Sequence, residues 1–255
     1  MTRWIPTKPS ATEPEARRPR RRAPGYVLTV ALALPLAALA APRADAVAPP
    51  SSGCAAVNLI VARASTEAPG EGITQSLATQ IVNSSTQTVS QEAVVYPATL
   101  TNYTSSESQG VTNAEQELTT AVSNCPNQKE VLLGYSQGAE VSMDVIAGNS
   151  EVGGTVAPVS TAISSHVVAI ANFGDPGHVV GQSWDLGTAT RAGLFPRSSA
   201  QLKLLTAFGG SSKIAGWCDA NDPYCASGLN LEVHLTYLDR YQNAAASFVL
   251  GKIGG

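Results

Sequence analysis

Basic residues are scarce once the N-terminal segment is set aside. Eight of the 16 Lys and Arg residues fall before residue 47, together with three of the 19 Asp and Glu residues. The remaining sequence carries 8 basic and 16 acidic residues, a formal charge of −8. This balance disfavours a nucleic-acid partner or an anionic membrane surface.

Apolar runs long enough to cross a membrane are also lacking. A membrane-spanning helix needs about 18 or more consecutive apolar residues. The apolar stretch at residues 26–41 is shorter, follows an arginine cluster at 17–22, and precedes Ala44-Asp45-Ala46. This order is typical of a secretory signal peptide with an A-x-A cleavage site. We therefore expect residues 1–46 to be removed and residues 47–255 to form one secreted domain with no integral membrane segment. No full twin-arginine motif is present, so the export route stays open.

Cysteines are few, and all four lie in the expected mature chain: Cys54, Cys125, Cys218 and Cys225. An even count in an exported protein predicts disulfides, and four cysteines allow three connectivities. Cys218 and Cys225 are near enough to close a small loop, which leaves Cys54 with Cys125. Their spacing matches no zinc finger or ribbon, so neither a metal nor a cofactor is expected.

Apolar strand-like segments alternate with segments of helical periodicity along the mature chain. This alternation predicts an α/β fold, with a central parallel sheet covered by helices on both faces. The expected strands are 57–62, 93–96, 130–134 and 167–171, with weaker candidates at 202–205 and 212–215. The expected helices are 73–82, 110–123, the segment from Ser136 to about Ala147, and 236–252, with a loop at 99–109.

The pentapeptide at 134–138, Gly-Tyr-Ser-Gln-Gly, directly follows the apolar run 131–133. It fits the G-x-S-x-G nucleophile elbow, a sharp strand-to-helix turn that exposes a serine oxygen at the edge of an α/β-hydrolase sheet. Glycines suit this turn because strand and helix approach closely there. The motif predicts Ser136 as a nucleophile.

Only three histidines are present to serve as its base. His166 immediately precedes a strand, which favours a structural role, and His178 follows a strand end. His234 lies near the C-terminus, which agrees with the order Ser, acid, His of α/β-hydrolases. The acid is then Asp222 or Asp219, both within the segment between Cys218 and Cys225. We favour a catalytic carboxylate, although Asp-x-Asn-Asp-Pro is also ordinary turn composition.

An oxyanion hole combines the N–H after the nucleophile with a donor from the loop after the first strand. The first donor is Gln137. The second is Ser65, in the loop 62–67, although Ser-Thr-Glu alone is more often a cap or a turn.

With these residues in place, the sequence resembles the cutinase family, which also contains acetylxylan esterases, over nearly the whole mature chain. The resemblance is carried by residues 62–67, residues 134–138, Cys218-x3-Asp222-x2-Cys225, and His234. It implies a small, lidless α/β-hydrolase whose triad is Ser136, Asp222 and His234, with Ser65 and Gln137 as the oxyanion hole. It also supports both disulfide pairs. Ala64 departs from the glycine of many members.

The subfamily is left open by two features. The four-cysteine count resembles the cutinase branch, whereas segments 193–197 and 217–225 resemble stretches near the acetylxylan branch.

Three apolar residues lie beside the presumed base: Leu229, Leu231 and Val233. An apolar rim there favours a hydrophobic acyl chain or polymer surface. Packing into the core is the equal alternative for these three side chains.

The function predicted is a secreted, monomeric serine esterase acting on carboxylic esters, such as a cutin-like polyester or short-to-medium acyl chains. An acetylxylan esterase is the alternative within the same chemistry. A protease with the same triad is weakly supported, because nothing predicts a peptide-binding cleft. A non-catalytic surface-binding protein that keeps the fold is the alternative of another class.

Overall fold

The structure is a computed structural model that describes residues 53–149 and 155–254. The expected signal peptide, residues 1–46, lies outside the described residues. Within them, no helix combines the length and the apolar character that crossing a membrane requires.

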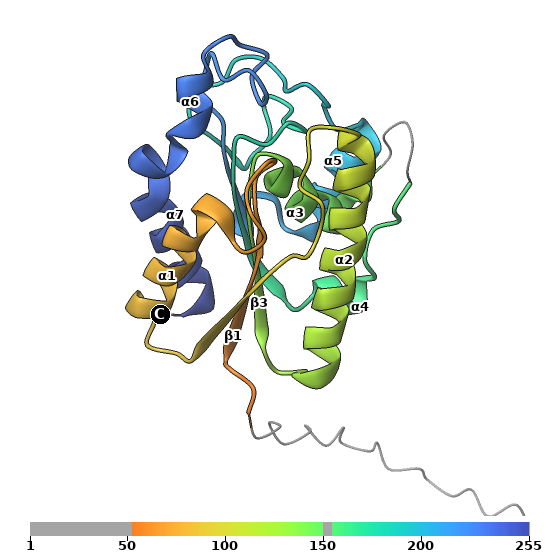
Figure 1. Ribbon diagram of the computed structural model, residues 1–255. Coiled ribbons are helices and arrows are strands. Elements are labelled where there is room, and N and C mark those ends of the chain that lie inside the picture. The colour runs from red at the N-terminus through yellow and green to blue at the C-terminus, as the bar shows by residue number, and fades with distance from the viewer. Residues whose placement is uncertain (1–52, 150–154, 255) are drawn as a thin grey trace, which may run out of the picture. The chain divides into compact units, whose positions relative to one another are not determined.

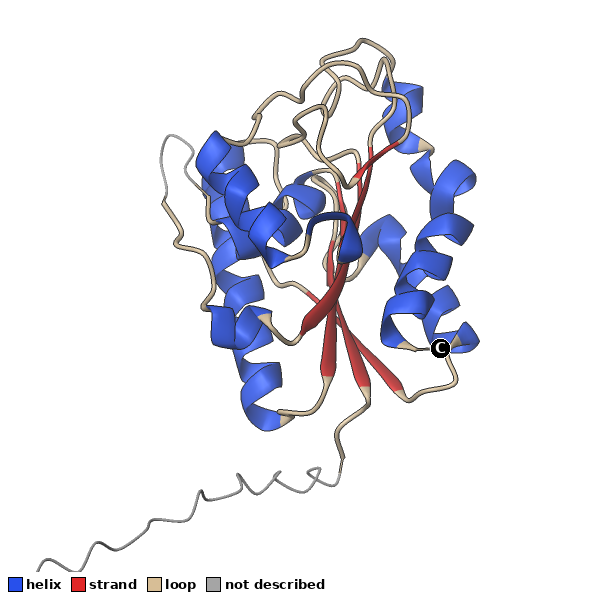
Figure 2. Cartoon of the chain, turned by 180° about the vertical axis from the view of Figure 1, so that it is seen from behind, coloured by secondary structure: helices blue, strands red, loops and turns tan. Residues whose placement is uncertain are grey.

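A sheet of six parallel strands forms the centre of the domain (Figure 2). The spatial order is β2-β1-β3-β4-β6-β5, so β2 and β5 are the edge strands. The strands are β1 (Val57–Ala62), β2 (Val89–Ala93), β3 (Lys129–Tyr135), β4 (Val167–Phe173), β5 (Asp185–Leu186) and β6 (Ile214–Trp217). Parallel pairing places the carboxyl ends of these strands at one edge of the sheet, the upper edge in Figure 1.

Helices cover both faces of this sheet (Figure 1). One face packs against α1 (Gln75–Ser84) and α7 (Tyr237–Ile253), and the other against α2 (Tyr103–Asn124), α3 (Gln137–Ala147) and α5 (Ser199–Phe208). The shorter helices are α4 (Thr161–Ser164), α6 (Leu231–Leu235), and the 3-10 turns η1 (Gly72–Thr74) and η2 (Gly210–Ser212). The predicted α/β class with helices on both faces is confirmed.

The central strands are apolar throughout because both of their faces are buried. All six residues of β1 are buried, and its alternate side chains enter the two core clusters on opposite faces of the sheet. This is the pattern expected of a parallel sheet between two helical layers. The edge strand β2 is polar instead, with three of its five residues exposed.

The strand predicted at 93–96 is wrong in position, because β2 ends at Ala93. The Val94 N–H still donates to the Val61 carbonyl of β1 at 2.9 Å, but the carbonyls of Val94 and Tyr96 accept hydrogen bonds from the buried Arg63 guanidinium. Burial of Val94 and Tyr96 in the core on the α2 face of the sheet, rather than further strand pairing, therefore explains the apolar character of these two positions, whereas Val95 is exposed.

Two other predictions are wrong in type. Residues 202–205 are helical, because Ser198 and Gln201 form a capping box that begins α5. Residues 103–109, expected in a loop, form the first turns of α2, where the Ser106 hydroxyl bonds to Gln137 on α3 at 3.1 Å. Tertiary contacts here outweigh the loop-like Ser/Thr composition.

The remaining elements differ in smaller ways. The strand expected at 212–215 is observed as β6, two residues later. The last helix agrees with the prediction, but the short helix α6 precedes it and was not expected. Neither α4 nor β5 has a sequence signal strong enough to have been predicted.

Both predicted disulfides are confirmed. Cys54 pairs with Cys125, which joins the start of β1 to the end of α2, and Cys218 pairs with Cys225. The second bridge closes a loop at the carboxyl end of β6, where the predicted acid lies.

Candidate active site

Ser136 occupies the sharp turn between β3 and α3. Its backbone has φ 55° and ψ −122°, a strained conformation for a residue with a β-carbon. A β-carbon on Gly134 would lie 2.3 Å from the Gly138 carbonyl oxygen, and one on Gly138 would lie 2.1 Å from that of Ala62. Both glycines of the motif are therefore required by close backbone approach, as a nucleophile elbow demands.

The carboxyl end of β4 lies directly beside this turn. The Ser136 N–H donates to the Phe173 carbonyl at 2.8 Å, and the next residue, Gly174, faces the His234 ring. A β-carbon at Gly174 would come within 2.8 Å of His234 Nδ1. The turn and the imidazole thus lie at one edge of the sheet.

His234 belongs to α6 and pairs with Asp222 inside the disulfide-closed loop. Its Nδ1 lies 2.8 Å from Asp222 Oδ2, and both side chains are buried. The second carboxylate oxygen accepts the backbone N–H groups of Tyr224 and Cys225, at 2.7 and 3.0 Å. Disulfide closure and these two hydrogen bonds fix the orientation of the carboxylate.

The pKa of Asp222 is held below its ordinary value. Burial raises this pKa, but the hydrogen bond and the charge of His234, with the N–H groups of Cys225 and Tyr224, lower it by more. The carboxylate therefore stays ionised, as a group that orients an imidazole and stabilises its cation must.

Asp219, the alternative acid, has other hydrogen-bond partners than His234. Its Oδ1 accepts from Thr188 and from the Tyr241 hydroxyl, and its Oδ2 pairs with Arg240 at 3.1 Å. These contacts brace the loop after β6. Of the two carboxylates, Asp222 is the one that reaches His234.

The structure does not place every predicted partner in contact. No hydrogen bond joins the Ser136 hydroxyl to His234 among the described residues, although both lie at the same sheet edge. His178 is buried 3.6 Å from Asp185, and His166 precedes β4. Neither of these two histidines contacts Asp222 or His234 through a hydrogen bond within the described part of the chain.

The two predicted oxyanion donors flank the elbow. Gln137 is the first residue of α3, so its N–H has no acceptor within the helix. The Ser65 hydroxyl is buried and has no partner among the described residues. Gly138 touches the carbonyls of Ala62 and Arg63, which brings the Ser65 loop against the start of α3. An N–H and a hydroxyl without partners suit the binding of an oxyanion.

The segment leading into His234 presents apolar side chains to solvent. Leu229 is 98% exposed and Leu231 is 49% exposed, whereas Val233 is half-buried. Core packing is therefore excluded for the two leucines. Leu100 and Leu194, on other loops at this edge, are exposed as well.

Three tyrosines that sequence reasoning missed surround the Asp222–His234 pair. Tyr135 donates to the His234 carbonyl, Tyr237 donates to Asp222 Oδ2 at 2.8 Å, and the Tyr224 ring lies 4.4 Å from the His234 ring. Tyr135 occupies the first of the two variable positions of the serine motif, and Tyr237 follows His234 by three positions. Neither spacing carries a signal before the fold is known.

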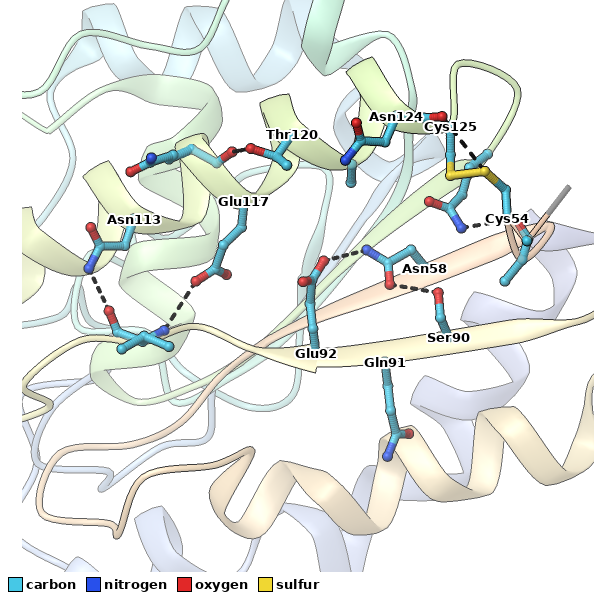
Figure 3. A pocket seen from close by; sticks show the side chains of 16 residues that line it. Cys54, Asn58, Ser90, Gln91, Glu92, Asn113, Glu117, Thr120, Asn124 and Cys125 are labelled. Carbon is cyan, nitrogen blue, oxygen red and sulfur yellow. Dashed lines mark hydrogen bonds between the residues drawn. A yellow bond between two sulfur atoms is a disulfide. The ribbon is translucent and has the colours of Figure 1, made fainter. Parts of the chain in front are cut away.

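A large cleft lies elsewhere, between the edge strand β2 and α2 (Figure 3). It measures about 680 Å³ and is lined by polar side chains, among them Asn58, Glu92 and Glu117, beside the Cys54–Cys125 bridge. Of the residues predicted for the site, it includes only those two cysteines. Among the residues described, no group of three or more His, Cys, Asp and Glu side chains is arranged to hold a metal ion.

Taken together, the parallel sheet, the strained serine turn and the buried Asp–His pair define an α/β-hydrolase. The sequence profile described as Cutinase matches residues 53–253. The chain belongs to the cutinase family. The prediction of a carboxylic ester hydrolase is confirmed at the level of this family.

Curated relatives carry several ester-hydrolase names. Acetylxylan esterase 2 of Talaromyces purpureogenus is 32% identical over 79% of this chain and 88% of its own length. Cutinase 11 of Verticillium dahliae is 30% identical over 78% and 70% of the two chains. Phospholipase Culp4 of Mycobacterium tuberculosis is 31% identical over 89% and 92%.

Solved structures agree with this assignment. An acetylxylan esterase structure superposes with a TM-score of 0.70 at 32% identity, covering 79% of this chain and all of that one. A Trichoderma reesei cutinase in complex with a phosphonate inhibitor gives a TM-score of 0.54 at 25% identity, covering 78% and 77%.

Proposed function

We propose that the protein is a secreted serine esterase that uses Ser136, His234 and Asp222 as a catalytic triad. The observation that carries the proposal is the buried 2.8 Å pair between His234 Nδ1 and Asp222, at the same sheet edge as the strained Ser136 turn. With Nδ1 engaged by Asp222, the imidazole Nε2 is the atom left to take the serine proton.

The reaction follows from these positions. Ser136 Oγ attacks the ester carbonyl while His234 Nε2 accepts its proton, and Asp222 stabilises the imidazolium. The tetrahedral oxyanion is held by Gln137 N–H and by Ser65. The imidazolium then protonates the departing alcohol, and the acyl-enzyme is hydrolysed by water activated at the same imidazole, which releases the carboxylic acid.

Exposed leucines favour a substrate with a hydrophobic acyl part. Leu229 and Leu231 precede the base, and solvent-exposed apolar residues at a site edge suit an acyl chain or a polymer or lipid surface. The exposed large apolar side chains of the described part are all aliphatic, whereas the rings of Tyr224, Tyr103 and Phe195 are half-buried. We therefore infer a cutin-like polyester or a short-to-medium acyl ester as substrate.

Acetylated xylan is the second candidate. It is favoured by the similarity to relatives named acetylxylan esterase, whose superposition is closer than that of the cutinase. The two candidates differ in what surrounds the ester, not in the chemistry at Ser136.

We further propose that residues 1–46 direct export and that residues 47–255 act as a monomer outside the cell. Two disulfides support an oxidising compartment.

The deciding experiment is a hydrolysis profile of p-nitrophenyl esters from acetyl to palmitoyl, with acetylated xylan and a cutin-like polyester beside it. Ser136→Ala is expected to abolish hydrolysis while leaving a folded protein, and an organophosphonate is expected to label Ser136. Full activity of the alanine variant would disprove the nucleophile assignment, and absence of labelling would favour the non-catalytic binding protein.

The rim can be tested on the same substrates. Replacing Leu229 and Leu231 by serine is expected to slow the longer esters about tenfold while leaving the acetyl ester within twofold. Leu204→Ser, an exposed leucine on α5, is the matched control. Equal losses on all chain lengths would argue against acyl contacts at the rim.

A further inference from the structure

We propose that Glu67 is a positioning residue that holds the Ser65 loop in the geometry needed to bind the oxyanion. This inference rests on the proposed function, because it concerns how one of the two oxyanion donors is placed. Glu67 ends the motif 62–67 that follows β1, and the ester need not touch it.

Both carboxylate oxygens of Glu67 bind backbone N–H groups. Oε2 accepts from Ala64 at 2.7 Å and Oε1 accepts from Ile73 at 2.7 Å. Ala64 directly precedes Ser65, and Ile73 lies in the turn η1 before α1. The carboxylate thus ties Ala64, the residue beside the proposed donor, to Ile73, nine positions further along the chain.

Arg63 holds the same loop from the other side. Its buried guanidinium donates to the carbonyls of Glu67 at 3.1 Å and Tyr96 at 2.6 Å, and lies 4.9 Å from the centre of the Tyr96 ring. The Tyr96 hydroxyl in turn donates to the Arg63 carbonyl. The backbone of the loop is therefore fixed at both ends of Ser65.

The loop needs this restraint because part of it is strained. Thr66 has φ 70°, a conformation that is unfavourable for a β-branched residue, and its N–H donates to the Ala98 carbonyl at 2.6 Å. Such a backbone persists only where the surroundings hold it. Since the Ser65 hydroxyl has no partner among the described residues, the loop backbone sets the direction of the Ser65 N–H and the point from which its side chain extends.

A carboxylate suits this position better than an amide does. Glutamine has the same size but only one acceptor oxygen, so its NH₂ group would face one of the two N–H donors. The loop would then lose either the Ala64 contact or the Ile73 contact. Loss of a donor that acts only on the transition state lowers kcat while leaving KM nearly unchanged.

The test compares Glu67→Gln with Glu117→Gln. Glu117 also accepts a backbone N–H, from Val95 at 3.2 Å, but it lies on α2 beside the polar cleft. Titration of Ser136 with an organophosphonate counts the competent sites, so that rates refer to folded enzyme only. We expect Glu67→Gln to lower kcat about 10- to 100-fold with KM within twofold, and Glu117→Gln to stay within twofold on both.

A double-mutant cycle with Ser65→Ala shows whether Glu67 acts through Ser65. If it does, the double variant loses at least threefold less than the product of the two single losses. The inference would be overturned if the loss of kcat in the double variant equalled the product of the two single losses. It would also be overturned if Glu67→Gln left kcat unchanged or only raised KM. Ser136→Ala in parallel keeps the two proposals apart: its full activity would disprove the triad, whereas an inactive Ser136→Ala beside a fully active Glu67→Gln would disprove only the role of Glu67.

Discussion

Two carboxylates are buried to the same extent in this domain and behave in opposite ways. Asp222 and Glu130 have no exposed surface. Asp222 accepts hydrogen bonds from two side chains and two backbone N–H groups. Glu130 accepts one from the Asn58 amide at 3.1 Å, and its Oε1 has no partner within the described chain. The two carboxylates therefore differ in the number of hydrogen-bond donors around them and not in their burial.

Their pKa values move in opposite directions as a result. Burial raises the pKa of Glu130 from 4.5 to about 7, although the Asn58 hydrogen bond lowers it. For Asp222, the hydrogen bonds and the charge of His234 outweigh burial, and the pKa falls below 3.8. The difference teaches that a buried carboxylate stays charged at neutral pH only where the fold supplies several donors.

The same difference fixes how each group changes stability with pH. Asp222 stabilises the fold above pH 3.8, and this contribution is lost as the pH falls through its lowered pKa. Glu130 binds its proton more tightly in the folded state, so its contribution is full below pH 4.5 and is lost as the pH rises to about 7.

The largest expected effect comes from Asp222→Asn. An amide cannot hold the imidazole in the tautomer that accepts the serine proton, so kcat is expected to fall about a thousandfold to ten-thousandfold. Asp219→Asn is the matched control in the same disulfide loop and is expected to lose less than about tenfold. Steady-state kinetics on a p-nitrophenyl ester measure both, and equal losses would remove the distinction between the two acids.

The two disulfides are expected to separate stability from activity. Replacing Cys54 and Cys125 by serine opens a loop with a sequence separation of 71 and is expected to cost about 4 kcal/mol. Replacing Cys218 and Cys225 opens one of only 7 and is expected to cost about 2.5 kcal/mol, with the greater loss of activity per folded molecule. Urea unfolding and active-site titration measure the two quantities. The opposite ranking of activities would contradict the role given to the small loop.

Tyr237→Phe removes one donor from Asp222 and leaves its other donors in place. We expect about 1–2 kcal/mol of stability to be lost, since hydrogen bonds to charged groups contribute in this range, and kcat/KM to fall up to about tenfold. The midpoint of acid unfolding is expected to rise, because the pKa of Asp222 moves back toward its ordinary value.

Tyr241→Phe is the matched control for this change, because its hydroxyl donates to Asp219 at 3.0 Å instead. It is expected to leave kcat/KM within twofold. Identical kinetics for the two phenylalanine variants would show that Tyr237 does not act through Asp222.

The smallest effect is expected from Glu130→Gln, at the other carboxylate. An amide of the same size carries no charge to be buried on folding, so this variant is expected to be more stable by about 1 kcal/mol at pH 8. Near pH 4 the two proteins are expected to be equally stable, and activity is expected to be unchanged. Urea titrations at both pH values measure the difference; a variant that is less stable at pH 8 would contradict the raised pKa.

Much of the fold could be predicted from the sequence because its central strands are apolar throughout. β1, β3 and β4 were found in place, as was α7, whose buried residues follow a helical spacing. The edge strand β2 was misplaced because its own residues are mostly polar, whereas the residues after it are apolar and two of them, Val94 and Tyr96, are buried. Helix α5 was missed because its capping box at Ser198 was not recognised.

Residues of the candidate site could be proposed from the sequence where a local pattern indicates the chemistry. Ser136 stands in a motif, and Asp222 is framed by two cysteines. The tyrosines at 135 and 237 carry no such pattern, because their hydroxyl partners are distant in sequence and meet only in the folded chain. Glu67 lies within a recognised motif, but its two backbone contacts depend on how the chain returns at Ile73.

The register of the parallel sheet has a consequence for how such an enzyme diversifies. Ala62 pairs with Gly134, Tyr135 with Phe173, and Phe173 with Trp217, so neighbouring strands end together. The loops that carry Ser65, Ser136 and Asp222 therefore begin at one level of the sheet, and under the proposed function each supplies one part of the machinery. Insertions or exchanges near Leu229 can alter what docks beside the ester while the sheet keeps the reacting groups aligned.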